Sequence, residues 1–488
     1  MDQAAAPRDD MTSLRTKLFY GLGSVSFGVK DNGFQTILFL FYNQVMHVPG
    51  GVVGIALAVA VMVDAFIDPV VGYTSDNLRT RWGRRHPLMY AAALPVAISY
   101  LLLWNPPNWS QQGLFVYLVV VAILVRTLIT FYEIPSSALA PELTQDYDQR
   151  TSFFGFRLFF AWYGGMTMYV LAFRVFLSPD AQHKVGQLNP AGYGHYGLTA
   201  AIVMASAILI SALGTHRFIP RLRVPEQRKG KVKDYFRDLL RILNNKAFFS
   251  LMRAGILFYF ATGLVFALNT YLQTYLWQLD NKQIAFIGLS TFIAVTLGFA
   301  IAIPVSRRFG KRDGGVIMFL IGLAISIVPL ALRLLGLFYQ NGSPALVPAL
   351  FLFNALGSAL TIGAGIPLVA MIADVVEDSE IRTGKRSEGV FFAGSSFMQK
   401  MASGLGLFGS GIIIWVSRFP ANAVPGKVDP HIVYNFSLLY LIVVVGLYVL
   451  AAAMLRRFPI TRESHNENLR KLAGEVPTLA DEPVAPSV

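Results

Sequence analysis

Two aspartates, Asp64 and Asp68, lie in the middle of an apolar segment, residues 51–76, that is long enough to cross a bilayer. Four residues apart on a helix, they lie one turn apart on the same face. A charge at the bilayer centre costs at least ~2.5–3.5 kcal/mol, so two carboxylates there need a partner or a function. Hard cations take carboxylate and carbonyl oxygens as ligands, which favours a site for a small cation. The alternative is a structural ion pair inside a helix bundle.

Further charged residues lie inside predicted spans, where each is also expensive to bury. Four acids and four bases share this position, and all four acids belong to the first half of the chain. The acids are Asp31, Asp64, Asp68 and Glu133, and the bases are Lys30, Arg126, Arg157 and Lys400. This bias toward one half favours a cation site over a purely structural network.

Thr130 and Glu133 are three residues apart and so share one helix face. With Asp64 and Asp68 they offer carboxylate and hydroxyl oxygens from two helices, a set that suits Na⁺ or Li⁺, whereas a proton needs only carboxylates. We therefore predict a cation site at Asp64, Asp68, Thr130 and Glu133, with Asp64 and Asp68 as metal ligands if the ion is Na⁺. The remaining polar groups able to hydrogen-bond a polar substrate are Lys30, Asp31, Arg126, Glu133 and Arg157. For Arg126 the alternative is a fixed partner for a neighbouring carboxylate.

The composition is that of a membrane protein. Apolar residues make up 54% of the 488 residues and charged residues only 14%, whereas a soluble protein carries about 25% charge. The charged opening, residues 1–17, has no short apolar segment with a cleavage site, so no signal peptide is expected. The chain has no cysteine, which excludes disulfides and thiolate metal sites.

Apolar windows of about 20 residues predict an all-α membrane protein with twelve transmembrane helices. The predicted spans are 18–46, 51–76, 87–104, 113–139, 151–177, 195–217, 247–277, 283–306, 314–337, 345–373, 387–417 and 431–457. They give a six-helix half at 18–217, a basic linker at 218–246 and a second six-helix half at 247–457. The linker contains an amphipathic stretch at 232–243 that suits a helix at the membrane surface. The N-terminus, 1–17, and the tail, 458–488, are expected in the cytoplasm, with 461–488 disordered.

The net charge is +13, and its distribution identifies the sides of the membrane. Of the 41 Lys and Arg residues, 30 fall in the termini and the loops that share one side of the predicted topology. This is the positive-inside pattern, so both termini are predicted in the cytoplasm, in a bacterial inner membrane. Because the basic residues are distributed by topology, nucleic-acid binding is not expected.

The two halves of the chain resemble each other. Ile134-Pro135 in the fourth span recurs as Ile366-Pro367 in the tenth, and at the same offset of 232 residues Glu142 corresponds to Asp374. The loop Gly83-Arg84-Arg85 has a counterpart in Gly310-Lys311-Arg312. Two related six-helix halves joined by a linker are typical of the major facilitator fold, whose substrate site lies midway between the halves.

Charged residues at the ends of spans suggest a cytoplasmic gate. Gly72-x3-Asp76 followed by Arg81-x-Gly83-Arg84-Arg85 resembles the loop signature of the major facilitator superfamily. An acid at a helix end and nearby arginines can latch the two halves, and releasing those pairs permits rocking. The alternative is that the arginines only set topology. The predicted gate residues are Asp76, Arg81, Arg84, Arg85, Asp374, Glu377, Arg382 and Arg386.

From about residue 15 to 457 the chain resembles the glycoside–pentoside–hexuronide:cation symporters, the family that includes melibiose permease. The most specific motif is Asp64-Ala65-x-x-Asp68-Pro69. Further matches are Lys30-Asp31, Glu133-Ile134-Pro135, Arg157, Ala373-Asp374 and Lys400. The resemblance implies alternating access, a coupling cation (Na⁺ or H⁺) at Asp64 and Asp68 completed by Thr130 and Glu133, and sugar contacts from Lys30, Asp31, Glu133 and Arg157. It also implies that Lys400 bridges the halves electrostatically, beside the substrate.

Three positions depart from that family's pattern. The span-four acid is the longer Glu133 rather than Asp, and Ser137 and Gly365 stand where tryptophans are expected. Because such aromatic rings pack against a sugar, a galactoside-type pocket is not expected. The added cation Arg126 favours an acidic substrate such as a hexuronide.

The resemblance leaves other cargo and other classes of protein to weigh. Sodium-dependent lysophospholipid symporters are more distant relatives, and lost tryptophans fit an amphiphile. An intramembrane prenyltransferase would use Asp64 and Asp68 for Mg²⁺-diphosphate, but it needs acidic clusters near helix ends in both halves. A non-transporting sensor is a further alternative, but no appended domain supports it. We therefore expect a transporter of a small molecule in the bilayer, with no enzymatic activity and no cofactor beyond the coupling ion.

Overall fold

The computed structural model describes residues 10–144, 146–222, 237, 241–383, 388–460, 463 and 467. All regular elements among these residues are helical, as expected. The predicted amphipathic stretch at 232–243 and the predicted disordered tail at 461–488 lie largely outside them.

The first predicted span is helical but interrupted. It comprises α1 (Leu14–Leu22), α2 (Val25–Asn32), the π-helix η2 (Gly33–Ile37), α3 (Leu38–Leu40) and the π-helix η3 (Phe41–Val45). Glycines allow other helices to approach it, since a Cβ at Gly23 would collide with the Tyr132 hydroxyl and one at Gly28 with the carbonyl of Ala161. The interruption lies at Gly23 and Ser24, next to one of these close approaches.

The other spans are longer single helices. Among the described residues, eleven helices are long and apolar enough to cross a membrane, and Leu14–Val45 supplies the twelfth predicted span. Their bounds are α4 (Gly50–Asn77), α5 (His86–Leu103), α6 (Gln111–Leu143), α7 (Tyr147–Leu171, continued by the π-helix η4, Ala172–Phe176), α8 (Pro190–His216), α10 (Lys246–Tyr271, continued by the π-helix η7, Leu272–Leu276), α11 (Asn281–Phe309), α12 (Lys311–Leu334), α13 (Leu346–Thr383), α14 (Glu388–Val416) and α15 (Pro430–Leu455). Short 3₁₀ turns lie at η5 (Gly186–Leu188) and η6 (Ile219–Arg221). The predicted all-α fold is confirmed.

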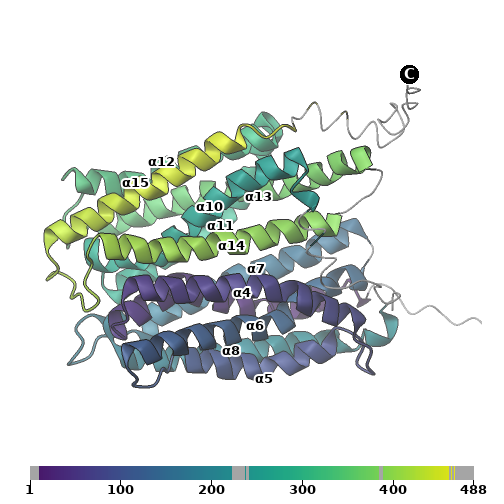
Figure 1. Ribbon diagram of the computed structural model, residues 1–488, viewed down its shortest axis with the longest axis horizontal. Helices are drawn as coiled ribbons and strands as arrows, with labels where there is room; N and C mark the ends of the chain where they lie inside the picture. Colours follow the sequence, from purple (N-terminus) through teal and green to yellow (C-terminus); the bar gives the residue numbers. More distant parts are fainter. Residues whose placement is uncertain are drawn as a thin grey trace, which may run out of the picture. The chain divides into compact units, whose positions relative to one another are not determined.

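The chain forms two compact units. Unit 1 comprises Met1–Val232, Gly263–Leu289 and Leu407–Phe436, and unit 2 comprises Lys233–Thr262, Ser290–Gly406 and Ser437–Val488. In unit 1, α4 packs on α6, α5 on α6 and α8, and α2 on α7, with α4, α5, α6 and α8 running alongside one another (Figure 1). In unit 2, α12 packs on α13. These units are defined by compactness, whereas the predicted halves 18–217 and 247–457 were defined by the sequence repeat. The division into those halves therefore stays a prediction.

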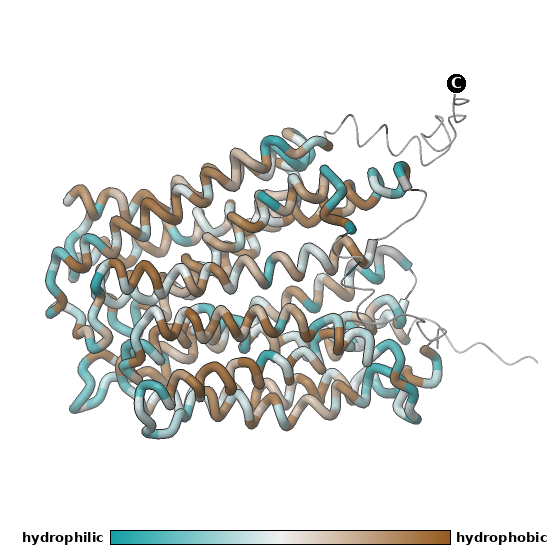
Figure 2. Tube along the Cα trace, in the orientation of Figure 1, coloured by the Kyte–Doolittle hydropathy of each residue, from teal (hydrophilic) through white to brown (hydrophobic). Residues whose placement is uncertain are grey.

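Hydropathy follows the helix axes. The long helices are apolar along most of their length and more polar near their ends and in the connecting loops (Figure 2). Large apolar side chains such as Leu94, Val116 and Leu213 are exposed on outer faces. This distribution is expected of helices whose outer faces contact lipid.

Each sequence half contains the same ion pair at an equivalent place. Arg84 Nη2 donates to Glu142 Oε1 at 2.8 Å, and Lys311 Nζ donates to Asp374 Oδ1 at 2.5 Å. Glu142 and Asp374 are equivalent in the repeat, as are Arg84 and Lys311. The sequence repeat is therefore accompanied by a repeated contact between a loop base and a helix acid.

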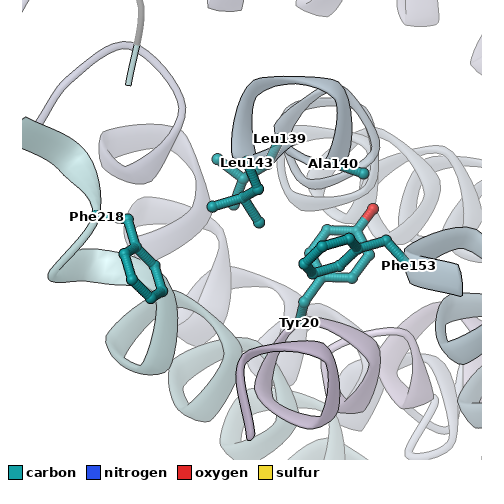
Figure 3. Packing of buried hydrophobic residues seen from close by; sticks show 6 residues of the cluster. All are labelled: Tyr20, Leu139, Ala140, Leu143, Phe153 and Phe218. Atoms are coloured by element: carbon teal, nitrogen blue, oxygen red, sulfur yellow. The ribbon is translucent and has the colours of Figure 1, made fainter. Parts of the chain in front are cut away.

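An apolar cluster fixes α1, α6 and α7 close to the charged residues of unit 1. It contains Tyr20, Leu139, Ala140, Leu143, Phe153 and Phe218 (Figure 3). The rings of Tyr20 and Phe153 pack edge to face, 5.3 Å apart. Phe153 precedes Arg157 by one helical turn, so this packing positions the arginine.

Candidate functional site

The paired aspartates of α4 face α6. Asp64 is buried, with its side chain 2% exposed, and Asp68 is half-buried. Arg126 donates to Asp64 Oδ2 from Nη2 at 2.8 Å and from Nε at 3.2 Å. Thr130 Oγ1 lies 3.0 Å from Asp64 Oδ1 and 3.4 Å from Asp68 Oδ1. The turn of α4 that carries Asp64 and Asp68 therefore lies opposite the turn of α6 that carries Arg126 and Thr130, and Arg126 pairs with Asp64.

Arg126 is enclosed as well as paired. Its side chain is only 8% exposed, and its guanidinium lies over the ring of Phe34, 5.5 Å from the centroid. Of the two readings of Arg126, substrate ligand or fixed partner of a carboxylate, the contacts match the second. The ion pair satisfies a carboxylate that would otherwise be costly at this depth.

A second charged group links α2 with α6. Lys30 Nζ lies 2.6 Å from Asp31 Oδ1 and 4.0 Å from Glu133 Oε2. The Lys30 side chain is 3% exposed, whereas Asp31 is 42% and Glu133 27% exposed. A buried ammonium thus holds two carboxylates whose free edges remain accessible. Such carboxylates can accept hydrogen bonds from hydroxyl groups of a ligand.

Arg157 of α7 completes this group. It donates to Ser136 Oγ at 2.8 Å and to the backbone carbonyl of Glu133 at 3.2 Å. Its guanidinium also lies over the ring of Phe27, 4.6 Å from the centroid. Arg157 therefore fixes the turn of α6 that carries Glu133. The sequence did not predict this contact, because nothing about Ser136 marks it as a partner of Arg157.

Lys400 lies in α14 within unit 2 and is half-buried. The other predicted substrate residues, Lys30, Asp31, Arg126, Glu133 and Arg157, lie in unit 1. The role of Lys400 beside the substrate stays a prediction.

Three of the predicted gate residues, Asp76, Arg84 and Arg85, contact partners within their own half. Arg85 lies 2.6 Å from Asp76 and 2.9 Å from Glu142, which also accepts from Arg84. Arg85 also donates to Ser75 Oγ at 2.8 Å. Glu142 was not among the predicted gate residues, although its match to Asp374 in the repeat was a signal.

The remaining gate candidates are placed as follows. Arg81 is exposed, with its guanidinium over Trp82. Asp374 is buried and pairs with Lys311, while Arg382 pairs with Asp378 at 3.1 Å. Glu377 is half-buried on α13. Arg386 lies outside the described residues.

A polar cluster that the sequence did not predict lies at the start of α4. Gln44 Nε2 donates to Asn43 Oδ1 at 2.7 Å and to the carbonyl of Pro420 at 3.1 Å. Tyr271 donates to Asn43 Oδ1 at 2.5 Å, and Tyr275 donates to Gln44 Oε1 at 2.9 Å. All of these residues belong to unit 1. The cluster ties the end of the first span to segments from the second sequence half, about 40 Å along α4 from the Asp76–Arg85 pair.

The described residues contain no group of three or more His, Cys, Asp or Glu side chains that could hold a metal ion. The predicted metal ligands Asp64 and Asp68 thus lie with a guanidinium and a hydroxyl rather than with a third carboxylate. Glu133 lies about one turn beyond Thr130 on α6, where it forms an ion pair with Lys30.

Comparison with known proteins gives matches over nearly the whole chain. The sequence profile described as MFS/sugar transport protein matches residues 19–462. The "Uncharacterized symporter sll1374" of Synechocystis sp. is 27% identical over 550 residues, covering 94% of this chain and 96% of that protein. The isoprimeverose transporter of Lactiplantibacillus pentosus is 24% identical over 421 residues, covering 86% and 84%. The inward-open structure of the xylose transporter XylE from E. coli superposes with a TM-score of 0.60 at 17% identity, covering 93% of this chain and 98% of that chain.

Proposed function

Because this chain belongs to the MFS/sugar transport protein family, we propose that it carries a sugar or glycoside across the membrane together with a coupling cation, Na⁺ or H⁺. As a member of that family it is an integral membrane transporter with the major facilitator fold, and not an enzyme. The symporter resemblance drawn from the motifs is confirmed by the relatives. The cargo and the ion are the parts that we propose.

The observation that carries the proposal is the Lys30–Asp31–Glu133 group. A sugar presents several hydroxyl groups, each of which both donates and accepts hydrogen bonds. Asp31 and Glu133 offer accessible carboxylate oxygens, and the buried Lys30 contacts Asp31 at 2.6 Å and attracts Glu133 from 4.0 Å. Hydrogen bonds that involve a charged partner are about twice as strong as neutral ones, so a small polar ligand gains both affinity and orientation here.

Alternating access explains the polar cluster at Asn43 and Gln44. In the transport cycle proposed here, the substrate enters from one side while the opposite side is closed. The hydrogen bonds from Tyr271 and Tyr275 hold that end of unit 1 closed. Opening it means exchanging these bonds for bonds to water, at a net cost of about 0.5–1.5 kcal/mol each, which ligand binding can offset.

We further propose that both termini and the arginine-rich loop containing Arg84 and Arg85 face the cytoplasm of a bacterial cell. The positive-inside pattern of the sequence supports this orientation. The cluster at Asn43 and Gln44 then faces the opposite side, since it lies at the other end of α4.

An amphiphile is the second candidate cargo. Gly365 has no atom within 4 Å of the place where a Cβ would stand, and the Ser137 hydroxyl bonds back to the carbonyl of Ile134. Neither position offers the aromatic surface expected for a galactoside. Space without an aromatic ring suits a substrate other than a galactoside, including a lysophospholipid.

Calorimetry on the purified protein tests the proposal. Glycosides, hexuronides and lysophospholipids are titrated one by one, each in Na⁺ buffer and in choline buffer at two pH values. Asp31→Asn is the site variant, and Asp180→Asn, on an exposed loop, is the matched control. Saturable binding of a sugar that weakens in Asp31→Asn but not in the control supports the proposal. Binding of a lysophospholipid alone would replace it with the second candidate.

A further inference from the structure

We propose that Arg126 is a built-in cation that takes the place of a metal ion at Asp64, so that this transporter binds neither Na⁺ nor Li⁺ in its acidic site within the membrane. Arg126 then determines the ion specificity of the symport on which this inference rests. A metal ion is what the paired aspartates would otherwise suggest, and the contacts of Asp64 do not fit one.

Both carboxylate oxygens of Asp64 have polar partners in the protein. Oδ2 accepts from two nitrogens of Arg126, at 2.8 and 3.2 Å, and Oδ1 lies 3.0 Å from the Thr130 hydroxyl. A metal ligand must instead direct a lone pair at the ion. A Na⁺ ion at Asp64 Oδ2 would have to displace the guanidinium, and one at Oδ1 would lie beside it.

Displacement of Arg126 is opposed by its surroundings. The side chain is buried, its guanidinium lies over the Phe34 ring, and it is held on the same helix as Thr130, one turn away. A guanidinium keeps its charge at any pH met by a protein, unlike a lysine. An ion at Asp64 would therefore lie within a few ångströms of a permanent like charge in a low-dielectric interior.

The Thr130 hydroxyl has three acceptors within reach of its one hydrogen. Its oxygen lies 2.9 Å from the carbonyl of Arg126, in addition to its contacts with the aspartates. One hydroxyl hydrogen cannot satisfy all three acceptors, and the 3.4 Å separation from Asp68 Oδ1 is long for a hydrogen bond. The exclusion of a metal ion at Asp64 therefore rests on Arg126 and not on Thr130.

Arg126 acts at Asp64 as a cation that is covalently part of the chain. Asp64 and Arg126 come from adjacent helices, and the guanidinium supplies in every state of the cycle the charge that a diffusing ion would supply only when bound. Proton-driven transport is compatible with this arrangement, because it requires no metal at Asp64. Sodium-driven transport through this aspartate is not.

Thermal unfolding of the purified full-length protein tests the proposal, since a ligand that binds only the folded state raises Tm in a saturable way. The six tryptophans supply the fluorescence signal. NaCl and LiCl are titrated against choline chloride at constant ionic strength. The chains compared are the wild type, Arg126→Lys, Arg126→Gln, and Arg126→Gln combined with Asp64→Asn.

We expect no Na⁺- or Li⁺-specific rise in Tm for the wild type and for Arg126→Lys. Arg126→Gln should gain a saturable rise, because the carboxylate loses its tethered cation, and the added Asp64→Asn should abolish it. A saturable rise in the wild type overturns the proposal, as does a folded Arg126→Gln protein that shows none. If Arg126→Gln does not fold, the wild type alone tests the proposal. A saturable rise in its Tm with NaCl, or direct binding of radioactive Na⁺ to it, overturns the proposal, and the absence of both supports it.

This experiment is independent of the cargo. If no sugar binds under any ionic condition, the proposed function fails, whereas the ion titrations remain interpretable. If a sugar binds and the wild type also takes up Na⁺ at the acidic site, only the assignment of Arg126 fails.

Discussion

Removing one member of the Asp64–Arg126 pair should destabilise the protein more than removing both. Asp64→Leu leaves a guanidinium without its carboxylate, and Arg126→Met leaves a carboxylate without its guanidinium. Both side chains are less than a tenth exposed, so little water can reach the charge that each single variant leaves without its partner. The Asp64→Leu/Arg126→Met double variant removes both charges and keeps apolar volume in their place.

The magnitude follows from the geometry. At 2.8 Å and an effective dielectric constant of about 20, the gross Coulomb attraction is about 6 kcal/mol. Desolvation of the two ions opposes most of it, so the intact pair contributes little net stability. Breaking a buried pair costs about 3–5 kcal/mol, whereas replacing it with apolar residues is often neutral. Each single variant should therefore lose about 3–5 kcal/mol and the double variant much less.

The assay is tryptophan fluorescence on heating the purified variants in one detergent. The expected order of Tm is wild type and double variant highest, with both single variants clearly lower. A matched control is the exposed pair Arg217–Asp10, whose removal should change Tm little because surface pairs contribute about 0–1 kcal/mol. The reasoning is refuted if either single variant matches the wild type, or if the double variant loses the sum of the two single losses.

Three further predictions concern other parts of unit 1. Glu142→Gln removes the nearly buried negative charge shared by two arginines and should cost about 3 kcal/mol, measured as a fall in Tm; an unchanged Tm would contradict the pairing. Tyr271→Phe removes the hydroxyl that donates to Asn43 and should ease opening of that end by about 1 kcal/mol, or about fivefold. Because the chain has no cysteine, this is measured as the thiol-labelling rate of Val45→Cys with and without Tyr271→Phe, and equal rates would contradict the closing role. Asp31→Asn should weaken sugar binding about tenfold or more while leaving Tm within a few degrees, and unchanged affinity would remove Asp31 from the site.

The sequence predicted the helices and the shared face of Asp64 and Asp68, because both follow from short-range periodicity. The four-residue spacing of Asp64 and Asp68 placed both on one face of α4, and that face does meet α6. The choice between a substrate-binding and a carboxylate-binding Arg126 stayed open, because spacing along one helix does not fix which turn of a neighbouring helix lies opposite. Only the packing of α4 on α6 brings Arg126 to Asp64.

Two features escaped prediction for a different reason. Asn43 and Tyr271 look like ordinary polar residues near the ends of spans, and 228 residues separate them in the chain. Nothing local indicates that they meet. The interruption of the first span at Gly23 was missed because apolar windows do not register glycines that are required by a close approach of Tyr132.

The ion pairs at the helix ends change the interpretation of the predicted gate. Arg84 and Arg85 were expected to latch the two sequence halves, yet both bind Glu142 in their own half, and Lys311 and Asp374 form the equivalent pair in the other. In each half the repeated pair joins the loop after one helix to the end of another. Each half is thereby stiffened, as rocking of rigid bodies requires.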